Sequence, residues 1–146
     1  MTCRYWVNVT SIGFTAAGSC ETVPITPASF NERFLPDSGT TLTYIPESAF
    51  NILLRAFPDA TETPSFGYVI DCSTRDQPGT IDFTFDDFTI NVKFSDFIFL
   101  IPAGPTSGPE DVCIIGAYPS DGIYILGDTF LRSVYGRQCL SLQFNN

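Results

Sequence analysis

The sequence predicts a mainly β fold with two short helices, and three observations support this prediction. Thr80–Phe85 and Phe88–Phe94 each alternate apolar and polar residues, and only Asp86 and Asp87 separate them, which is typical of a β-hairpin. Phe97–Ile101 is a short, continuous apolar run of the kind that forms buried strands. Apolar residues recur at helical spacing in the segments 46–57 and 128–135.

The remaining strands are expected where β-branched and aromatic residues cluster between turn residues. In chain order, the expected strands are Arg4–Val9, Tyr68–Asp71, Thr80–Phe85, Phe88–Phe94, Phe97–Ile101, Cys113–Gly116, Ile123–Leu126 and Cys139–Phe144. Asp59–Ser65 and Ala103–Pro109 combine proline or glycine with small polar residues, so both are expected to be loops.

The two helices have start and stop signals of their own. Pro46 suits the first helical position of 46–57, and Pro58 ends that segment. Its apolar positions are Ala49, Phe50, Leu53, Leu54 and Phe57. The shorter helix would bury Leu131 together with Val134 or Tyr135.

Composition indicates one domain spanning 1–146 and excludes several functions. The chain has 146 residues, is 44% hydrophobic, and carries sixteen acidic against seven basic residues, for a net charge of −9. This charge argues against nucleic acid or an anionic membrane as a partner, because both require a basic surface. The negative charge is compatible with a simple role in solubility and also with an enzyme that works at low pH. No apolar run reaches the length of a membrane-spanning helix.

The residue types exclude further chemistry. The chain has no histidine, which removes Ser-His-Asp and Cys-His nucleophile systems and the usual zinc sites. We therefore expect neither a metal nor a cofactor. The five cysteines, at 3, 20, 72, 113 and 139, contain no C-x-x-C pair and suggest disulfides made in an oxidising compartment. Because five is odd, at least one thiol is free or pairs outside the chain.

Secretion is also consistent with Asn8-Val9-Thr10, which matches the acceptor pattern for N-glycosylation. The N-terminal segment Met1–Ser19 is not a signal peptide, since Arg4 and other polar residues interrupt its apolar part. An extracellular protein would therefore need an export signal upstream of this sequence.

The motif with the clearest chemical content is Asp37-Ser38-Gly39-Thr40-Thr41, which directly follows the segment Phe34-Leu35-Pro36. Such a turn can present a carboxylate at a strand end, with hydroxyl and N–H groups to hold it and a glycine that permits close backbone approach. An ordinary β-turn with an Asx or ST motif fits the same five residues.

The order of the motifs along the chain helps to decide between a functional carboxylate turn and an ordinary β-turn. The Asp37 motif continues Leu42-Thr43-Tyr44-Ile45-Pro46 into a helix, and Tyr68-Val69-Ile70-Asp71-Cys72 follows. After the Phe-rich hairpin come Ser95-Asp96-Phe97, Cys113, and finally Ile125-Leu126-Gly127-Asp128 with Thr129-Phe130-Leu131-Arg132. Over roughly residues 4–135 this order resembles the C-terminal lobe of pepsin-like aspartic proteases of the fungal, secreted type.

The resemblance assigns roles to individual residues. It makes Asp37 one of two catalytic carboxylates, with Ser38 linking the two active-site loops and Thr40 bonding the outer carboxylate oxygen. Gly39 and Thr41 would face a peptide substrate. The other matching residues would have structural roles. Ile125, Leu126 and Gly127 would form a strand beside the active-site loop, and Asp128 would cap the short helix. Cys72 and Cys113 would form a disulfide. Independently of the resemblance, we expect Cys3 and Cys20 to form the second bridge and to close a hairpin whose first strand is Arg4–Val9, which leaves Cys139 free.

Three departures from the family pattern are visible. Pro36 precedes Asp37 and cannot donate to a strand ladder. The region after Tyr135 is short, and the N-terminal lobe with its own aspartate is absent from this sequence. In pepsin-like enzymes, the standard example of coupled carboxylates, two aspartates share a proton, so one aspartate alone should not make a competent peptidase.

Four interpretations therefore remain open. The chain is one lobe of a two-lobed enzyme whose partner is an N-terminal protease lobe, or it is a homodimer in which two copies of Asp37 meet. Alternatively, it is a non-catalytic binding or inhibitor protein that reuses the lobe, or an unrelated β protein. A second polypeptide or a second carboxylate beside Asp37 would distinguish the enzymes from the others.

Overall fold

The computed structural model describes residues 5–137 and is mainly β, as predicted. The elements in chain order are β1 (Val7–Val9), β2 (Ser11–Thr15), β3 (Thr22–Pro24), β4 (Glu32–Pro36), β5 (Thr43–Pro46), α1 (Glu47–Arg55), β6 (Thr61–Thr63), β7 (Gly67–Ile70), the 3₁₀ helix η1 (Cys72–Asp76), β8 (Thr80–Phe85), β9 (Phe88–Lys93), α2 (Phe94–Phe97), β10 (Phe99–Ile101), β11 (Val112–Ile114), β12 (Ala117–Ser120), β13 (Tyr124–Leu126) and α3 (Asp128–Arg137). The two expected helices are α1 and α3. The short helices α2 and η1 were not expected.

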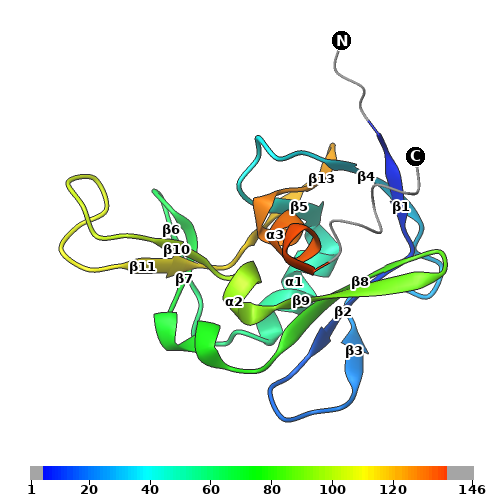
Figure 1. The fold of residues 1–146 in the computed structure, drawn as a ribbon, viewed down its shortest axis with the longest axis horizontal. Coiled ribbons are helices and arrows are strands. Elements are labelled where there is room, and N and C mark those ends of the chain that lie inside the picture. Colours follow the sequence, from blue (N-terminus) through cyan, green and yellow to red (C-terminus); the bar gives the residue numbers. More distant parts are fainter. Residues whose placement is uncertain (1–4, 138–146) are drawn as a thin grey trace.

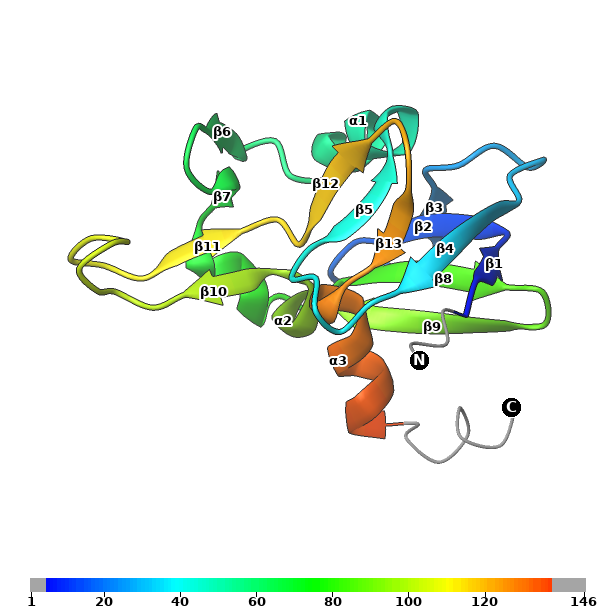
Figure 2. The same ribbon diagram turned by 90° about the horizontal axis from the view of Figure 1, so that it is seen from above.

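The strands form three sheets (Figure 1). A five-stranded sheet has the order β1-β4-β13-β5-β12, and two four-stranded sheets have the orders β3-β2-β8-β9 and β10-β11-β7-β6. Figure 2 shows the last of these to one side of the other two, with the loop between β10 and β11 extending furthest from the body. Helix α3 lies against α2 and β9.

The predicted hairpin is confirmed, but the segment that follows its second strand differs from the prediction. Strands β8 and β9 pair antiparallel from Thr80↔Lys93 to Phe85↔Phe88. The chain then turns into α2 at Phe94, so the expected strands Phe88–Phe94 and Phe97–Ile101 were each wrong at the end that meets α2. The single helical turn buries both Phe94 and Phe97, because residues three apart lie on one helix face.

Other boundaries moved by one or a few residues. Pro46 was predicted to be the first helical residue, but it ends β5 and is the N-cap of α1, so the helix begins one residue later, at Glu47. Strands β2, β3, β4, β5, β6 and β12 were not among the expected strands, and most are short with little alternation of their own. Strand β6 lies within Asp59–Ser65, so the expectation of a loop over that whole segment was wrong. The expected strand Cys139–Phe144 lies outside the described residues.

The core is rich in aromatic side chains. Its largest fully buried members are Phe34, Phe50, Phe83 and Phe97, accompanied by several isoleucines and Leu53, Leu126 and Val9. Neighbouring rings pack at the edge-to-face and tilted angles that aromatic pairs favour, as between Phe83 and Phe130 at 5.0 Å. This accounts for the large number of phenylalanines in a chain of this size.

One carboxylate is buried in the β2-β3-β8-β9 sheet. Asp82 is 2% exposed although the alternation of β8 places it opposite the apolar face. Its oxygens accept from the hydroxyls of Thr15 at 2.6 Å, Thr22 at 3.2 Å and Thr80 at 2.7 Å, and from the Asn91 side-chain amide at 2.6 Å. Four donors from four strands thus replace the water that the carboxylate has lost.

The cysteines confirm one expected bridge and contradict the other. Cys72 and Cys113 form a disulfide that joins the start of η1 to β11. Cys20 is a free, exposed thiol, so the expected Cys3–Cys20 bridge was wrong. The expected hairpin around that bridge does not exist, because β1 pairs with β4 while β2 takes β3 as its neighbour. Cys139 lies outside the described residues.

Candidate functional site

The candidate site lies where β13, which comes late in the sequence, is inserted between the earlier strands β4 and β5. Strand β13 pairs parallel with β4, with Ile125 opposite Leu35, and antiparallel with β5, with Ile125 opposite Tyr44. The loop 37–42 joins β4 to β5 and therefore has to cross the end of β13, as Figure 2 shows. The Asp37 motif forms this loop.

The carboxylate of Asp37 is held by its own turn. Its Oδ1 accepts from the backbone N–H of Gly39 at 3.0 Å, and its Oδ2 accepts from the Thr40 hydroxyl at 2.6 Å. The backbone N–H of Thr40 also donates to the Asp37 carbonyl at 3.2 Å, which closes the turn. Asp37 is half-buried, whereas Ser38 and Gly39 are exposed. The carboxylate is thus oriented at an accessible surface.

The junction of β13 and α3 supports this loop from behind. The backbone N–H of Asp37 donates to the Leu126 carbonyl at 3.0 Å, and the N–H of Asp128 donates to the Thr40 carbonyl at 2.8 Å. Gly127 lies between these bonds, and a Cβ atom there would be 2.1 Å from the Leu42 carbonyl oxygen. Only glycine lets the two backbones approach this closely.

Two buried threonines connect the same elements. The hydroxyl oxygens of Thr43 and Thr129 lie 3.0 Å apart, and neither residue is exposed. The Thr129 hydroxyl donates to the Gly116 carbonyl at 2.7 Å, so the Thr43 hydroxyl is the donor between the two. The Thr43 oxygen also accepts from the N–H of Gly127 at 3.3 Å. This short chain of hydrogen bonds ties β5 to the start of α3.

Pro36 does not disrupt the strand that leads to Asp37. The pairing of β4 with β13 extends through Pro36, which lies opposite Leu126. Because successive N–H groups point to opposite sides of a strand, the N–H of Asp37 faces β13 and the nitrogen of Pro36 faces β1. The β1–β4 ladder ends at Val7 opposite Phe34, so no donor is required from Pro36.

The structure thus brings most of the proposed site residues together. Gly39 and Thr40 contact the Asp37 carboxylate, and Ile125–Gly127 runs beside its loop. Ser38 and Thr41 are exposed. Asp128 is the first residue of α3, and its carboxylate accepts from Arg132 Nε at 2.9 Å, so this side chain forms an ion pair along the helix.

Sequence reasoning missed Thr43, Thr129 and Gly116. Thr43 stands between Leu42 and Tyr44, and Thr129 precedes Phe130, so each hydroxyl interrupts an apolar stretch. Such a position is a weak signal for a buried hydrogen bond, and it does not indicate the partner.

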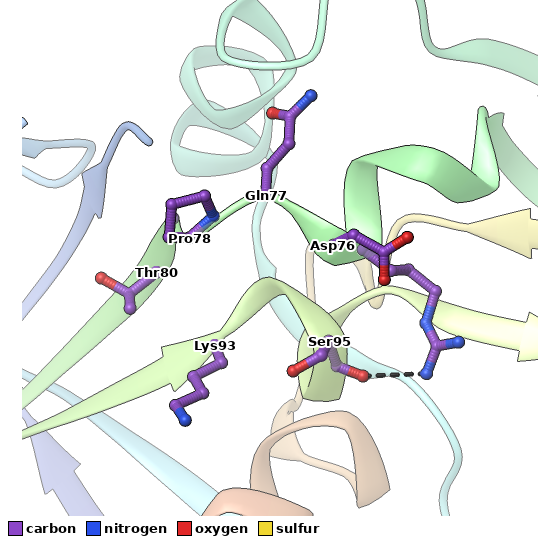
Figure 3. A pocket seen from close by; sticks show the side chains of 8 residues that line it. Asp76, Gln77, Pro78, Thr80, Lys93 and Ser95 are labelled. Atoms are coloured by element: carbon purple, nitrogen blue, oxygen red, sulfur yellow. Dashed lines mark hydrogen bonds between the residues drawn. The ribbon is translucent and has the colours of Figure 1, made fainter. Parts of the chain in front are cut away.

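A cavity of about 370 Å³ lies elsewhere, between η1, β8, β9 and α2 (Figure 3). Arg75 lines it but is already engaged, because its guanidinium donates to the carbonyls of Ser95 at 3.0 Å and Ile98 at 3.1 Å. None of the lining residues belongs to the Asp37 loop. The cavity is therefore separate from the Asp37 loop, and Arg75 holds the chain at Ser95 and Ile98 rather than facing a ligand.

Residues 5–137 contain neither a cluster suited to a metal ion nor a helix suited to span a membrane. No group of three or more histidine, cysteine, aspartate or glutamate side chains in this range is placed to hold a metal ion. None of the helices described there has both the length and the apolar character needed to cross a membrane.

A mainly β fold, with an Asp-Ser-Gly-Thr turn that crosses the end of a strand directly before a glycine, defines a fragment of a pepsin-like aspartic protease. The chain belongs to the eukaryotic aspartyl protease family, whose model matches residues 4–139.

Relatives in this family include fungal proteins. Aspartic proteinase yapsin-3 of Saccharomyces cerevisiae is 36% identical over 104 residues, which are 69% of this chain and 19% of that protein. Candidapepsin-1 of Candida albicans is 36% identical over 115 residues, 72% of this chain and 27% of the relative. Secreted aspartic protease 5 of Candida albicans is 40% identical over 110 residues, 72% of this chain and 25% of the relative. The chain therefore spans about a quarter or less of each relative's length.

Proposed function

We propose that this chain is the C-terminal lobe of an aspartic endopeptidase and supplies Asp37 as one of its two catalytic carboxylates. The single observation that supports this most strongly is the Asp37 turn, in which Gly39 N–H and the Thr40 hydroxyl orient the carboxylate at the surface. Membership of the eukaryotic aspartyl protease family supports the reaction class.

The chemistry requires a second carboxylate. One aspartate takes a proton from a water molecule while the other, protonated, polarises the carbonyl of the scissile peptide bond. Two such groups close together share one proton, because like charges at that distance cannot both ionise. The second aspartate would come from an N-terminal lobe, and Ser38 would link the two active-site loops. Gly39 and Thr41 would contact the peptide substrate.

The compartment is part of the same proposal. Relatives include proteins named secreted aspartic proteases, and the Cys72–Cys113 disulfide suits an oxidising environment. We place the protein in the secretory pathway or outside the cell.

The test joins this chain to the N-terminal lobe of a secreted aspartic protease relative and measures peptide cleavage at acidic pH. We expect cleavage by the joined protein and none by the isolated chain. Asp37→Asn is nearly isosteric and should abolish turnover while leaving the circular dichroism spectrum unchanged. Asp87→Asn, in the exposed turn between β8 and β9, is the matched control and should retain activity. Cleavage that survives Asp37→Asn would contradict the proposal.

Measurements on the isolated chain also distinguish a homodimeric protease from one lobe of a two-lobed enzyme. If the chain alone cleaves peptides and sedimentation shows a dimer, two copies of Asp37 form the site and the second lobe is unnecessary. An inactive joined protein that folds and binds peptide would favour the non-catalytic alternative.

A further inference from the structure

We propose that Asn8 is a site of N-linked glycosylation, with the first sugar lying on a small exposed surface formed by Asn8, Arg33 and Trp6. The proposal rests on the secretory location given above, but not on the peptidase activity. Asn8-Val9-Thr10 is the only N-x-[ST] sequence in the chain. The ligand class is an oligosaccharide joined through N-acetylglucosamine.

The fold leaves the Asn8 side chain available. Asn8 lies in β1, which in the described part of the chain is one of the two edge strands of the five-stranded sheet. Val9 is fully buried and Asn8 is exposed, so the alternation of the strand directs the amide away from the core. A glycan there would not have to displace any core side chain.

The threonine of the acceptor sequence is engaged in the folded protein. Both the backbone N–H and the hydroxyl of Thr10 donate to the Thr84 carbonyl, at 2.8 and 3.2 Å. A transferase that must contact this hydroxyl therefore has to act on the unfolded chain, before Thr10 forms its bonds to Thr84 in β8. Modification would precede folding, as it does for chains that are modified during export.

The chemical step is a group transfer from a lipid diphosphate-linked oligosaccharide. A bond forms between Asn8 Nδ2 and the anomeric carbon of the first sugar, and the bond from that carbon to the phosphate oxygen breaks. The lipid diphosphate leaves with the electron pair, and Nδ2 loses one proton. Nothing is oxidised or reduced.

Arg33 and Trp6 define where the first sugar would lie. Arg33 is directly opposite Asn8 in the β1–β4 register, so the two side chains share one face of the sheet. The Arg33 guanidinium stands 4.8 Å from the centre of the Trp6 ring, which places the ring on that same face. Trp6 is 39% exposed, and a sugar attached to Asn8 would cover part of this apolar surface.

The position is compatible with the proposed active site. Arg33 precedes Asp37 by four residues along the chain, or roughly 13 Å of extended strand. The glycan would therefore sit away from the Asp37 turn, and its removal should not change peptide cleavage by the joined protein.

The experiment secretes the chain from a yeast host behind a host signal peptide and measures glycan occupancy by intact mass and glycosidase treatment. We expect a glycan on the wild-type chain and on Thr10→Ser, and none on Asn8→Gln or Thr10→Val. A secreted, folded wild-type chain with unmodified Asn8 would overturn the assignment. Failure of peptide cleavage in the joined protein would contradict the proposed function alone, because occupancy is measured independently.

Trp6 provides a second readout, because it is the only tryptophan in the sequence. Acrylamide should quench its fluorescence less in the glycosylated chain than in the same sample after enzymatic deglycosylation. Equal quenching before and after deglycosylation would overturn the placement of the sugar beside Trp6.

Discussion

The hydroxyl oxygens of Thr43 and Thr129 meet at 3.0 Å in the interior, although 86 positions separate the two residues in the sequence. Thr43 follows the Asp37 loop, and Thr129 is the second residue of α3, the helix behind that loop. The pair thus connects two parts of the candidate site that do not touch the carboxylate directly.

Thr43→Val should lower the free energy of unfolding by about 1–3 kcal/mol, because it leaves the buried N–H of Gly127 without its acceptor. Urea denaturation would measure the change. Thr89→Val is the matched control, since Thr89 pairs with Thr84 at 2.9 Å on the exposed face of the hairpin. Equal losses for the two variants would show that the buried pair has no special role.

Gly127→Ala should destabilise the chain by about 1–3 kcal/mol or more, because the added methyl group would overlap the Leu42 carbonyl oxygen. Thermal unfolding monitored by circular dichroism would report it. Gly122→Ala introduces the same methyl group into open space and should be nearly neutral. A Gly127→Ala chain as stable as Gly122→Ala would refute the close approach of β13 to the Asp37 loop.

Asp82→Asn keeps the shape of the buried side chain but replaces one acceptor oxygen with a donor. Since the donors of Thr15, Thr22, Thr80 and Asn91 all point at this group, we expect a loss of about 2 kcal/mol or more. Asp87→Asn makes the same chemical change at an exposed turn and should have little effect. Comparison of the two denaturation midpoints is the measurement.

Tyr68 should make the chain sensitive to alkaline pH. Burial raises the pKa of Tyr68 above its ordinary value of 10.0, and the nearby charge of Glu62 raises this pKa further. The folded state therefore favours the neutral phenol, so this contribution to stability is complete below the ordinary pKa and is lost as the pH rises through the raised one. Tyr68→Phe should flatten the fall in stability above about pH 10. Tyr5→Phe, at an exposed position, should not.

The sequence was informative where structure depends on near neighbours. The alternation of Thr80–Phe85 sufficed to predict β8 with its observed bounds, because a strand's two faces can be read from period two alone. Phe94–Phe97 shows the limit of this reasoning, because its two phenylalanines extend the apolar patterns of the segments on either side and also lie on one face of a helical turn.

Contacts between distant segments could not be predicted in the same way. The position of Asp37 before a glycine and two threonines indicated a carboxylate-holding turn, and the structure places Gly39 and Thr40 on that carboxylate. The Thr43–Thr129 pair and the docking of Gly127 on Leu42 arise only from the crossing of β13 between β4 and β5. Pairing of Cys20 was mispredicted because the partner of β1 is also a distant strand, β4.

The insertion of β13 between β4 and β5 also constrains the order in which the molecule can assemble. Strands β4 and β5 leave the ribosome well before β13, and they share no neighbour until Tyr124–Leu126 has been synthesised and has closed the long loop that follows β5. Closing such a loop costs entropy before any contact compensates for it, so the turn that carries Asp37 should be among the last parts to become rigid. During synthesis, the hairpin of β8 and β9 can form first and offer a surface on which the other strands pack, whereas the loop that carries the carboxylate lacks its supporting strand until Tyr124–Leu126 has been made.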